Sequence, residues 1–125
     1  WWWGQGSTDF LTIANAPQAW EDFKKNIADV KSLRPVLTAP GTIQRWVEKS
    51  GKAEIHLWVK ETAQKITFIA VNVTSTETDA VFEARGFDNN ATLTRVFENG
   101  SVKVIDGKIK DRFAPKEAHV YELVK

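Results

Sequence analysis

The six tryptophans are the residues of this chain best suited to contact a ligand. Trp46 and Trp58 both fall in segments where polar and apolar residues alternate, and Gln44 and His56 occupy the same polar positions two residues before each indole. An indole ring is a flat apolar surface with one hydrogen-bond donor, on which the C–H face of a pyranose can stack. Polar neighbours can then bond the sugar hydroxyls. These residues predict a carbohydrate-binding surface.

That surface depends on how two predicted strands, Thr42–Glu48 and Glu54–Glu61, are arranged. The sequence Lys49-Ser50-Gly51-Lys52 between them is typical of a turn. If the strands pair across this turn, antiparallel register places Trp46 and Trp58 on the same polar face. The structural alternative is that both indoles fill a seam against another part of a larger protein, with their N–H groups bonded there.

Trp1, Trp2 and Trp3 open the chain, and such an aromatic start is unexpected for a natural N-terminus. We interpret it as a cut through a longer, secreted protein whose signal lies upstream. If ordered on the surface, the three rings would form a second aromatic sugar site. If exposed without order, they would favour self-association.

Catalytic and metal-binding patterns are not evident in the sequence. The two histidines, His56 and His119, fall on different predicted strands without a carboxylate or nucleophile at a recognisable spacing. The chain has no cysteine. Asp88-Asn89-Asn90 lacks the spaced ligands of a calcium loop and favours a turn. We therefore expect no catalytic residue, no cofactor and no metal site.

Composition excludes further classes of partner. Lys and Arg total 17 against 16 Asp and Glu, and the two signs alternate along the 125 residues. Nucleic-acid binders usually gather a basic excess on one surface, so nucleic acid is not an expected partner. No run of about 18 apolar residues occurs, so a membrane-spanning helix is not expected either.

One helix is predicted near the N-terminus. Asn15-Ala16-Pro17 resembles a helix start, and apolar residues then recur at helical spacing through Trp20, Phe23, Ile27, Val30 and Leu33. Trp20 belongs to that stripe and is expected in a core. Pro35 limits the length of the helix. A boundary near Thr38 to Gly41 divides the chain into segments 1–38 and 42–125.

From residue 42 onward, short segments with two-residue periodicity alternate with turns, and about eight strands are expected. Asp88-Asn89-Asn90, Asn99-Gly100 and Asp106-Gly107 suit turns with positive φ. This spacing favours an antiparallel β-sandwich with one N-terminal helix. The expected strands are Thr42–Glu48, Glu54–Glu61, Lys65–Val73, Ala80–Arg85, Ala91–Phe97, Val102–Ile105, Lys108–Phe113 and Ala118–Leu123.

Several of these segments resemble a known arrangement. The ending Phe113 to Leu123, preceded by a short hairpin at Val102 to Ile109, resembles the closing strand of the β-sandwich that follows the catalytic barrel in many glycoside hydrolases. Ile66 to Asn72 is similar to the central strand of those sandwiches. Trp20 to Leu37 resembles their last barrel helix, and Trp1 to Gly6 would then be a remnant of the last barrel strand.

The resemblance implies a non-catalytic fragment, because both catalytic carboxylates of such enzymes sit at the ends of earlier barrel strands. It implies a carbohydrate-binding module that holds a secreted parent enzyme near a polysaccharide, with that polysaccharide and the parent catalytic domain as partners. The alternatives are an accessory domain that braces the barrel without binding sugar, and a module that contacts another protein through its tryptophans.

Overall fold

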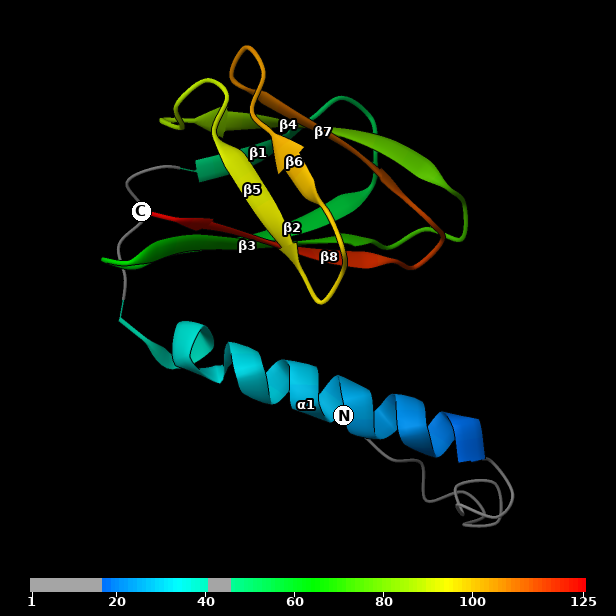
Figure 1. Ribbon diagram of the computed structural model, residues 1–125. Helices are drawn as coiled ribbons and strands as arrows, with labels where there is room; N and C mark the ends of the chain where they lie inside the picture. Colours follow the sequence, from blue (N-terminus) through cyan, green and yellow to red (C-terminus); the bar gives the residue numbers. More distant parts are fainter. Residues whose placement is uncertain (1–16, 41–45) are drawn as a thin grey trace. The chain divides into compact units, whose positions relative to one another are not determined.

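The computed structural model describes residues 17–40 and 46–125 (Figure 1). They fall into two compact units, which divide between Pro35 and Val36. The first contains most of the helix, and the second contains every described strand.

The helix α1 spans Pro17–Thr38, so its predicted start at a proline is confirmed. A proline in the first turn costs no hydrogen bond, because the N–H groups there have no partner within the helix. The predicted limit at Pro35 is wrong, since α1 runs three residues past it with the loss of one internal N–H donor. Among the described residues, α1 lacks the apolar length that crossing a membrane requires.

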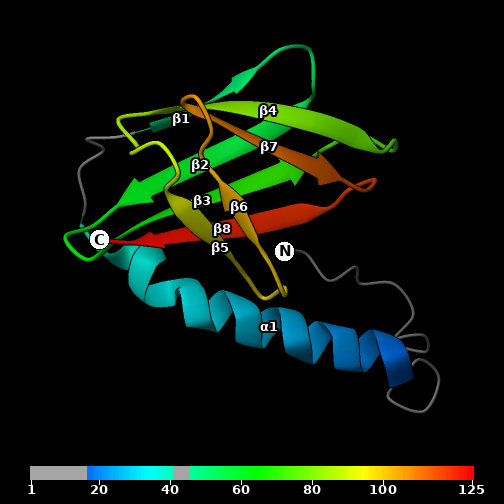
Figure 2. The ribbon, with the colours of Figure 1, turned by 45° about the horizontal axis from the view of Figure 1, so that its top comes forward.

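The predicted sandwich of about eight strands is confirmed, with two antiparallel sheets facing each other (Figures 1 and 2). One sheet has the order β1-β4-β7 and the other β2-β3-β8-β5-β6. The strands are β1 Trp46–Ser50, β2 Ile55–Glu61, β3 Lys65–Asn72, β4 Thr78–Arg85, β5 Thr92–Val96, β6 Ser101–Lys103, β7 Lys108–Phe113 and β8 Ala118–Val124.

The core lies between the two sheets and consists of the residues that alternate inward along each strand. Aromatic rings form its centre: Phe68 stacks on Tyr121 at 4.3 Å between ring centroids, and Phe82 meets Phe113 edge to face at 6.1 Å. Burial of these large side chains is the main stabilising term of the fold. The other core residues are Val47, Ile55, Ile66, Ala70, Ala80, Ala84, Phe87, Leu93, Val102, Val104 and Ile109.

The predicted hairpin between the first two strands is wrong. Strand β1 pairs with β4, whereas β2 pairs with β3 in the opposite sheet. Both strands still bury their apolar side chains, because Val47 and Ile55 reach the same core from opposite sides. Period-two alternation specifies only that one face of a strand is buried. It therefore fits a crossing between sheets as well as a hairpin.

Strands β6 and β7 also do not pair with each other, as the predicted hairpin at Val102 to Ile109 would have required. An isolated bridge joins Ile105, two residues past the end of β6, to Lys108, and the two strands belong to different sheets. The turn between them contains Asp106 at φ 51° and Gly107 at φ 71°, so the predicted positive φ is confirmed there. It is confirmed at Asn90 and Gly100 as well.

Asn72, at the end of β3, forms hydrogen bonds with two connections at one end of the sandwich. Its Nδ2 donates to the carbonyl oxygens of Thr76 and Ala114 at 2.8 and 2.9 Å. Its Oδ1 accepts from the N–H and the hydroxyl of Thr74. The side chain is fully buried, and each of its polar atoms has a partner. The segment before β8 is thereby held at a defined position.

Candidate functional site

The two-tryptophan surface does not form as predicted. Because β1 and β2 lie in different sheets, the Cα partner of Trp46 is Arg85 and that of Trp58 is Ile69. Trp46 and Trp58 therefore do not share a sheet face. Gln44 and Trp1, Trp2 and Trp3 lie outside the described residues, as does the side chain of Trp46.

Trp58 lies on the outer face of the five-stranded sheet. Ile55, Leu57 and Val59 of β2 point toward the core, so the alternating residues His56, Trp58 and Lys60 point outward. Trp58 keeps 38% of its surface exposed, and His56 is also exposed. Because β2 is at the edge of its sheet, the ring has a strand neighbour on one side only. It is accessible to a ligand.

An apolar row runs from Trp58 across the middle of this outer face. The backbone register aligns Trp58 with Ile69 of β3, Ile69 with Val120 of β8, and Val120 with Val96 of β5. Side chains at directly opposed positions lie about 5 Å apart and pack on one another. Val120 is only 9% exposed, so the middle of the row is well covered.

A polar row lies next to the apolar one. It starts at Lys60 beside Trp58 and continues through Thr67 and Glu122. Lys65 Nζ pairs with Glu122 Oε1 at 2.6 Å, and the Thr67 hydroxyl donates to the same oxygen at 3.4 Å. Lys60 is the member of this row on the same strand as Trp58, whereas Thr67 is only 1% exposed and Glu122 lies two strands away from Trp58.

A second group of polar side chains lies inside the sandwich, centred on Asp111 of β7. Its Oδ1 accepts from the guanidinium of Arg95, and its Oδ2 accepts from the Tyr121 hydroxyl. His119 Nδ1 lies 3.0 Å from Oδ2. Asp111 belongs to the three-stranded sheet and its partners to the five-stranded sheet, so these contacts join the two layers. Burial, and then the Asp111 carboxylate, raise the pKa of Tyr121 above its ordinary value of 10.0.

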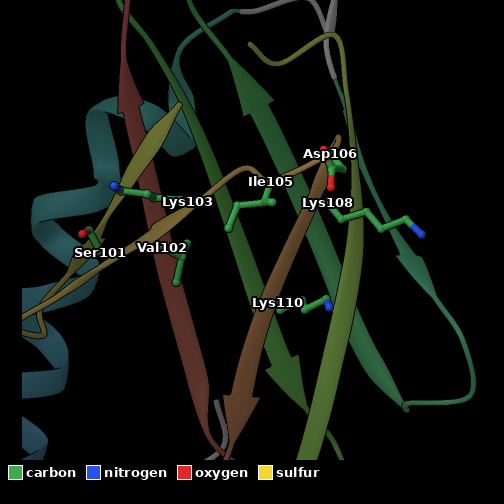
Figure 3. A pocket seen from close by; sticks show the side chains of 7 residues that line it. All are labelled: Ser101, Val102, Lys103, Ile105, Asp106, Lys108 and Lys110. Carbon is green, nitrogen blue, oxygen red and sulfur yellow. The ribbon is translucent and has the colours of Figure 1, made fainter. Parts of the chain in front are cut away.

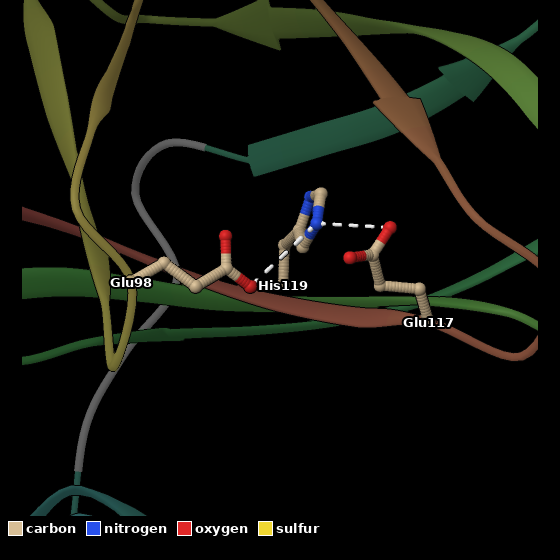
Figure 4. Close-up of side chains that lie close together, drawn as sticks. All are labelled: Glu98, Glu117 and His119. Carbon is tan, nitrogen blue, oxygen red and sulfur yellow. Dashed lines mark ion pairs between the residues drawn. The ribbon is translucent and has the colours of Figure 1, made fainter.

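The other ring nitrogen of His119 faces two glutamates. Figure 4 shows the imidazole between the carboxylates of Glu98 and Glu117, with Nε2 at 3.6 Å from Glu98 Oε1 and 3.4 Å from Glu117 Oε2. Glu98 follows β5, whereas Glu117 immediately precedes β8. The backbone N–H of Ala114, 2.6 Å from Glu117 Oε2, lowers the pKa of this carboxyl below its ordinary value of 4.5, and His119 lowers it further.

The meeting of these side chains was not predicted from the sequence, where no metal site was expected. Glu98, Glu117 and His119 offer ligand atoms that lie within 4.8 Å of one another. Nineteen positions separate Glu98 from Glu117, and only the pairing of β5 with β8 brings them together. The sequence nevertheless contained an indication of polar groups inside the sandwich, because Arg95, Asp111 and His119 occupy positions in three predicted strands that should face the core.

A third region, between β6 and β7, is a hollow of about 560 Å³ (Figure 3). Its lining contains no aromatic residue on which a sugar could stack. Lys103 and Lys108 extend in opposite directions from it, so their charges do not converge on one point. The residues that line it are Ser101, Val102, Lys103, Ile105, Asp106, Lys108 and Lys110.

Comparison of the chain with protein-family models, with curated proteins and with solved structures gives no match. Two features of the described residues could bind a ligand: the exposed indole of Trp58 with the polar row beside it, and the group around the buried His119.

Proposed function

We propose that the chain is a non-catalytic carbohydrate-binding module of a secreted, polysaccharide-degrading glycoside hydrolase, and that it binds a β-glycan by stacking a sugar ring on Trp58. The observation that carries the proposal is the 38% exposure of this indole on the outer face of the sandwich. The flat indole, with one N–H donor at its edge, suits stacking on the C–H face of a sugar ring.

Polar groups suited to sugar hydroxyls lie on both sides of the ring. His56 and Lys60 flank Trp58 on its own strand, one on each side of the ring. Glu122 adds a carboxylate, already paired with Lys65, that can accept from a hydroxyl. Hydrogen bonds to charged groups are stronger than those between neutral ones, so these residues would orient a ring that the indole holds.

A single described indole implies weak binding. One stacked sugar ring contributes only a few kcal/mol, and much of this offsets the freedom that the sugar chain loses on binding. Weak affinity suits a module whose task is to keep an enzyme near an extended polymer. Each repeat of such a polymer offers another position for binding, so the effective local concentration of sites is high.

The alternative is an accessory domain that braces the catalytic barrel without binding sugar. The observation that favours it is that the exposed indole of Trp58 continues into Ile69 on the next strand, because an apolar edge of this kind suits packing against another protein surface. In that arrangement Trp58 would be part of the packed seam, and free sugar would not compete for it.

Affinity electrophoresis of the chain in gels containing xylan, mixed-linkage β-glucan, glucomannan or hydroxyethyl cellulose tests the proposal. We expect one polysaccharide to retard the chain. Trp58→Ala should lower the affinity for that polysaccharide about tenfold, since a stacking ring contributes on the order of 1.4 kcal/mol. Ile105→Ala is the control, because Ile105 is 60% exposed but lies at the turn after β6. It should be retarded like the parent chain.

Circular dichroism must show that both variants remain folded. Absence of retardation in every gel would reject sugar binding and leave the bracing role. Retardation that Trp58→Ala does not weaken would reject Trp58 as the stacking residue. A defined dimer that Trp58→Ala dissociates would instead indicate a protein-interaction surface.

A further inference from the structure

We propose that Glu98, Glu117 and His119 form a binding site for a divalent transition-metal cation, with Zn²⁺ as the best match. The proposal does not depend on sugar binding, because these residues lie at the turn after β5 and at the start of β8, whereas Trp58 lies on β2. The bound ion would connect the turn after β5 to the start of β8.

The orientation of His119 favours this site. Its side chain is 3% exposed, and Nδ1 lies 3.0 Å from Asp111 Oδ2 and 3.1 Å from the Tyr121 hydroxyl. These two contacts hold the ring so that Nε2 faces Glu98 and Glu117. Without a proton, Nε2 would ligate a cation there. A carboxylate that holds a histidine in this way is a common neighbour of zinc-ligating histidines.

The charges around the ring also favour a cation. The carboxylates of Asp111, Glu98 and Glu117 surround the imidazole, and among the described residues Arg95 supplies the one guanidinium that pairs with the first two of them. The carboxylates therefore outnumber the guanidinium, and a divalent cation would be attracted to this excess of negative charge.

The distances between the ligand atoms also fit a metal site. In a tetrahedral zinc site with bonds of roughly 2.0–2.2 Å, neighbouring ligand atoms lie about 3.4 Å apart. Nε2 lies 3.4 Å from Glu117 Oε2 and 3.6 Å from Glu98 Oε1. The two carboxylate oxygens lie within 4.8 Å of each other. Their side chains are 34% and 37% exposed, so they can rotate toward each other and leave an opening through which the ion enters.

The ligand set also selects the class of ion. One imidazole and two carboxylates suit Zn²⁺ and neighbouring transition metals, whereas Ca²⁺ and Mg²⁺ prefer oxygen ligands throughout. Three protein ligands leave the fourth position of a tetrahedral site for water.

Isothermal titration of the whole, EDTA-treated chain with ZnSO₄, followed by thermal unfolding, tests the proposal. We expect one ion per chain, and a rise in Tm of about 10 °C or more when free zinc is a hundredfold above Kd. Glu98→Gln and Glu117→Gln should each weaken binding about tenfold or more while the chain stays folded. CaCl₂ should produce no comparable shift.

Two control variants separate this site from incidental zinc binding. His56→Gln removes the only other histidine, and Glu54→Gln removes an exposed carboxylate that lies before β2. Both should bind zinc like the parent chain. Loss of binding in His56→Gln, or full binding in both Glu98→Gln and Glu117→Gln, would overturn the assignment.

The ring nitrogens of His119 provide a readout independent of affinity. Long-range ¹H–¹⁵N spectra should show Nδ1 protonated and Nε2 shifted by the metal when one equivalent of zinc is added. An Nε2 that stays protonated at saturating zinc would instead identify His119 as an imidazolium paired with the two glutamates, and would reject the metal site.

Discussion

The outer faces of the two sheets differ in kind. On the three-stranded sheet, the outward positions are mostly charged, and Glu48 pairs with Arg85 at 2.6 Å. Arg112 there pairs with Glu77, which raises the pKa of the guanidinium. On the five-stranded sheet, the middle of the outer face is the apolar row from Trp58 to Val96. Covering charged groups with an apolar partner costs desolvation energy, whereas covering an exposed apolar ring is favourable. Contact with a ligand or another protein is therefore expected at the Trp58 edge of the five-stranded sheet, because Val120 in the middle of the row is already buried.

Both outer faces exist only while the two sheets stay packed together. Asp111 makes polar contacts from one sheet to the other, so we expect its substitution to have the largest effect on stability. Asp111→Ala leaves the guanidinium of Arg95 and the hydroxyl of Tyr121 without their shared acceptor. We expect a loss of about 3–5 kcal/mol in the free energy of unfolding, as for other broken buried ion pairs. Urea denaturation of the variant and the parent chain measures it.

Asp79→Ala is the matched control, because its carboxylate is 81% exposed on the outer face of the same sheet. It should change stability by less than about 0.5 kcal/mol. Equal losses in the two variants would show that the inner contacts of Asp111 are no stronger than exposed ones.

Alkaline titration measures the ionisation of Tyr121, which is buried between the two sheets. Tyr121 retains its proton in the fold above pH 10, where the unfolded chain loses it, because burial raises its pKa. Stability from this residue is present below the ordinary pKa of 10.0 and falls by about 1.4 kcal/mol for each pH unit above it. Tyr121 is the only tyrosine, so absorbance at 295 nm follows it alone.

We expect that absorbance to rise together with the loss of the circular dichroism signal. A rise near pH 10 in a chain that is still folded would show that the hydroxyl is accessible to solvent and that its contact with Asp111 is weak.

Two matched substitutions, one on each outer face, compare the faces directly. Of the predicted changes in stability, theirs are the smallest. Ile69 and Val81 both point outward from the middle of a strand, the first between Trp58 and Val120, the second opposite Lys110. Ile69→Glu should cost about 1–2 kcal/mol, because it places a charge among apolar neighbours. Val81→Glu should change stability by less than about 0.5 kcal/mol, because the new carboxylate faces a lysine.

Thermal unfolding of the two variants under identical conditions makes the comparison. If Val81→Glu is as destabilising as Ile69→Glu, the two faces are equivalent, and the preference for a partner on the five-stranded sheet is lost.

The number and kind of elements were predictable, because each strand carries its own local signals. Period-two alternation located the strands, and Asn90, Asp106 and Gly100 marked turns whose positive φ the structure confirms. The exposure of Trp58 followed from the same alternation, which placed it opposite the core-facing Leu57 and Val59.

Pairing of the strands was not predictable in the same way. Alternation is a property of one strand, whereas the partner of a strand is a property of the whole sandwich. That is why Trp46 and Trp58 were expected together and lie in different sheets. The group around His119 was missed for the same reason, since it requires β5, β7 and β8 to be assembled first.

The position of β8 also affects when the sandwich can form. This strand lies between β3 and β5, yet it follows every other strand in the sequence. At a synthesis rate of about 5–20 residues per second, β3 waits several seconds for the partner that covers its second edge. Sheets closed by such distant pairs fold slowly, in roughly milliseconds to seconds. The nascent chain therefore exposes an unpaired edge of β3, with Phe68 beside it, until β8 leaves the ribosome.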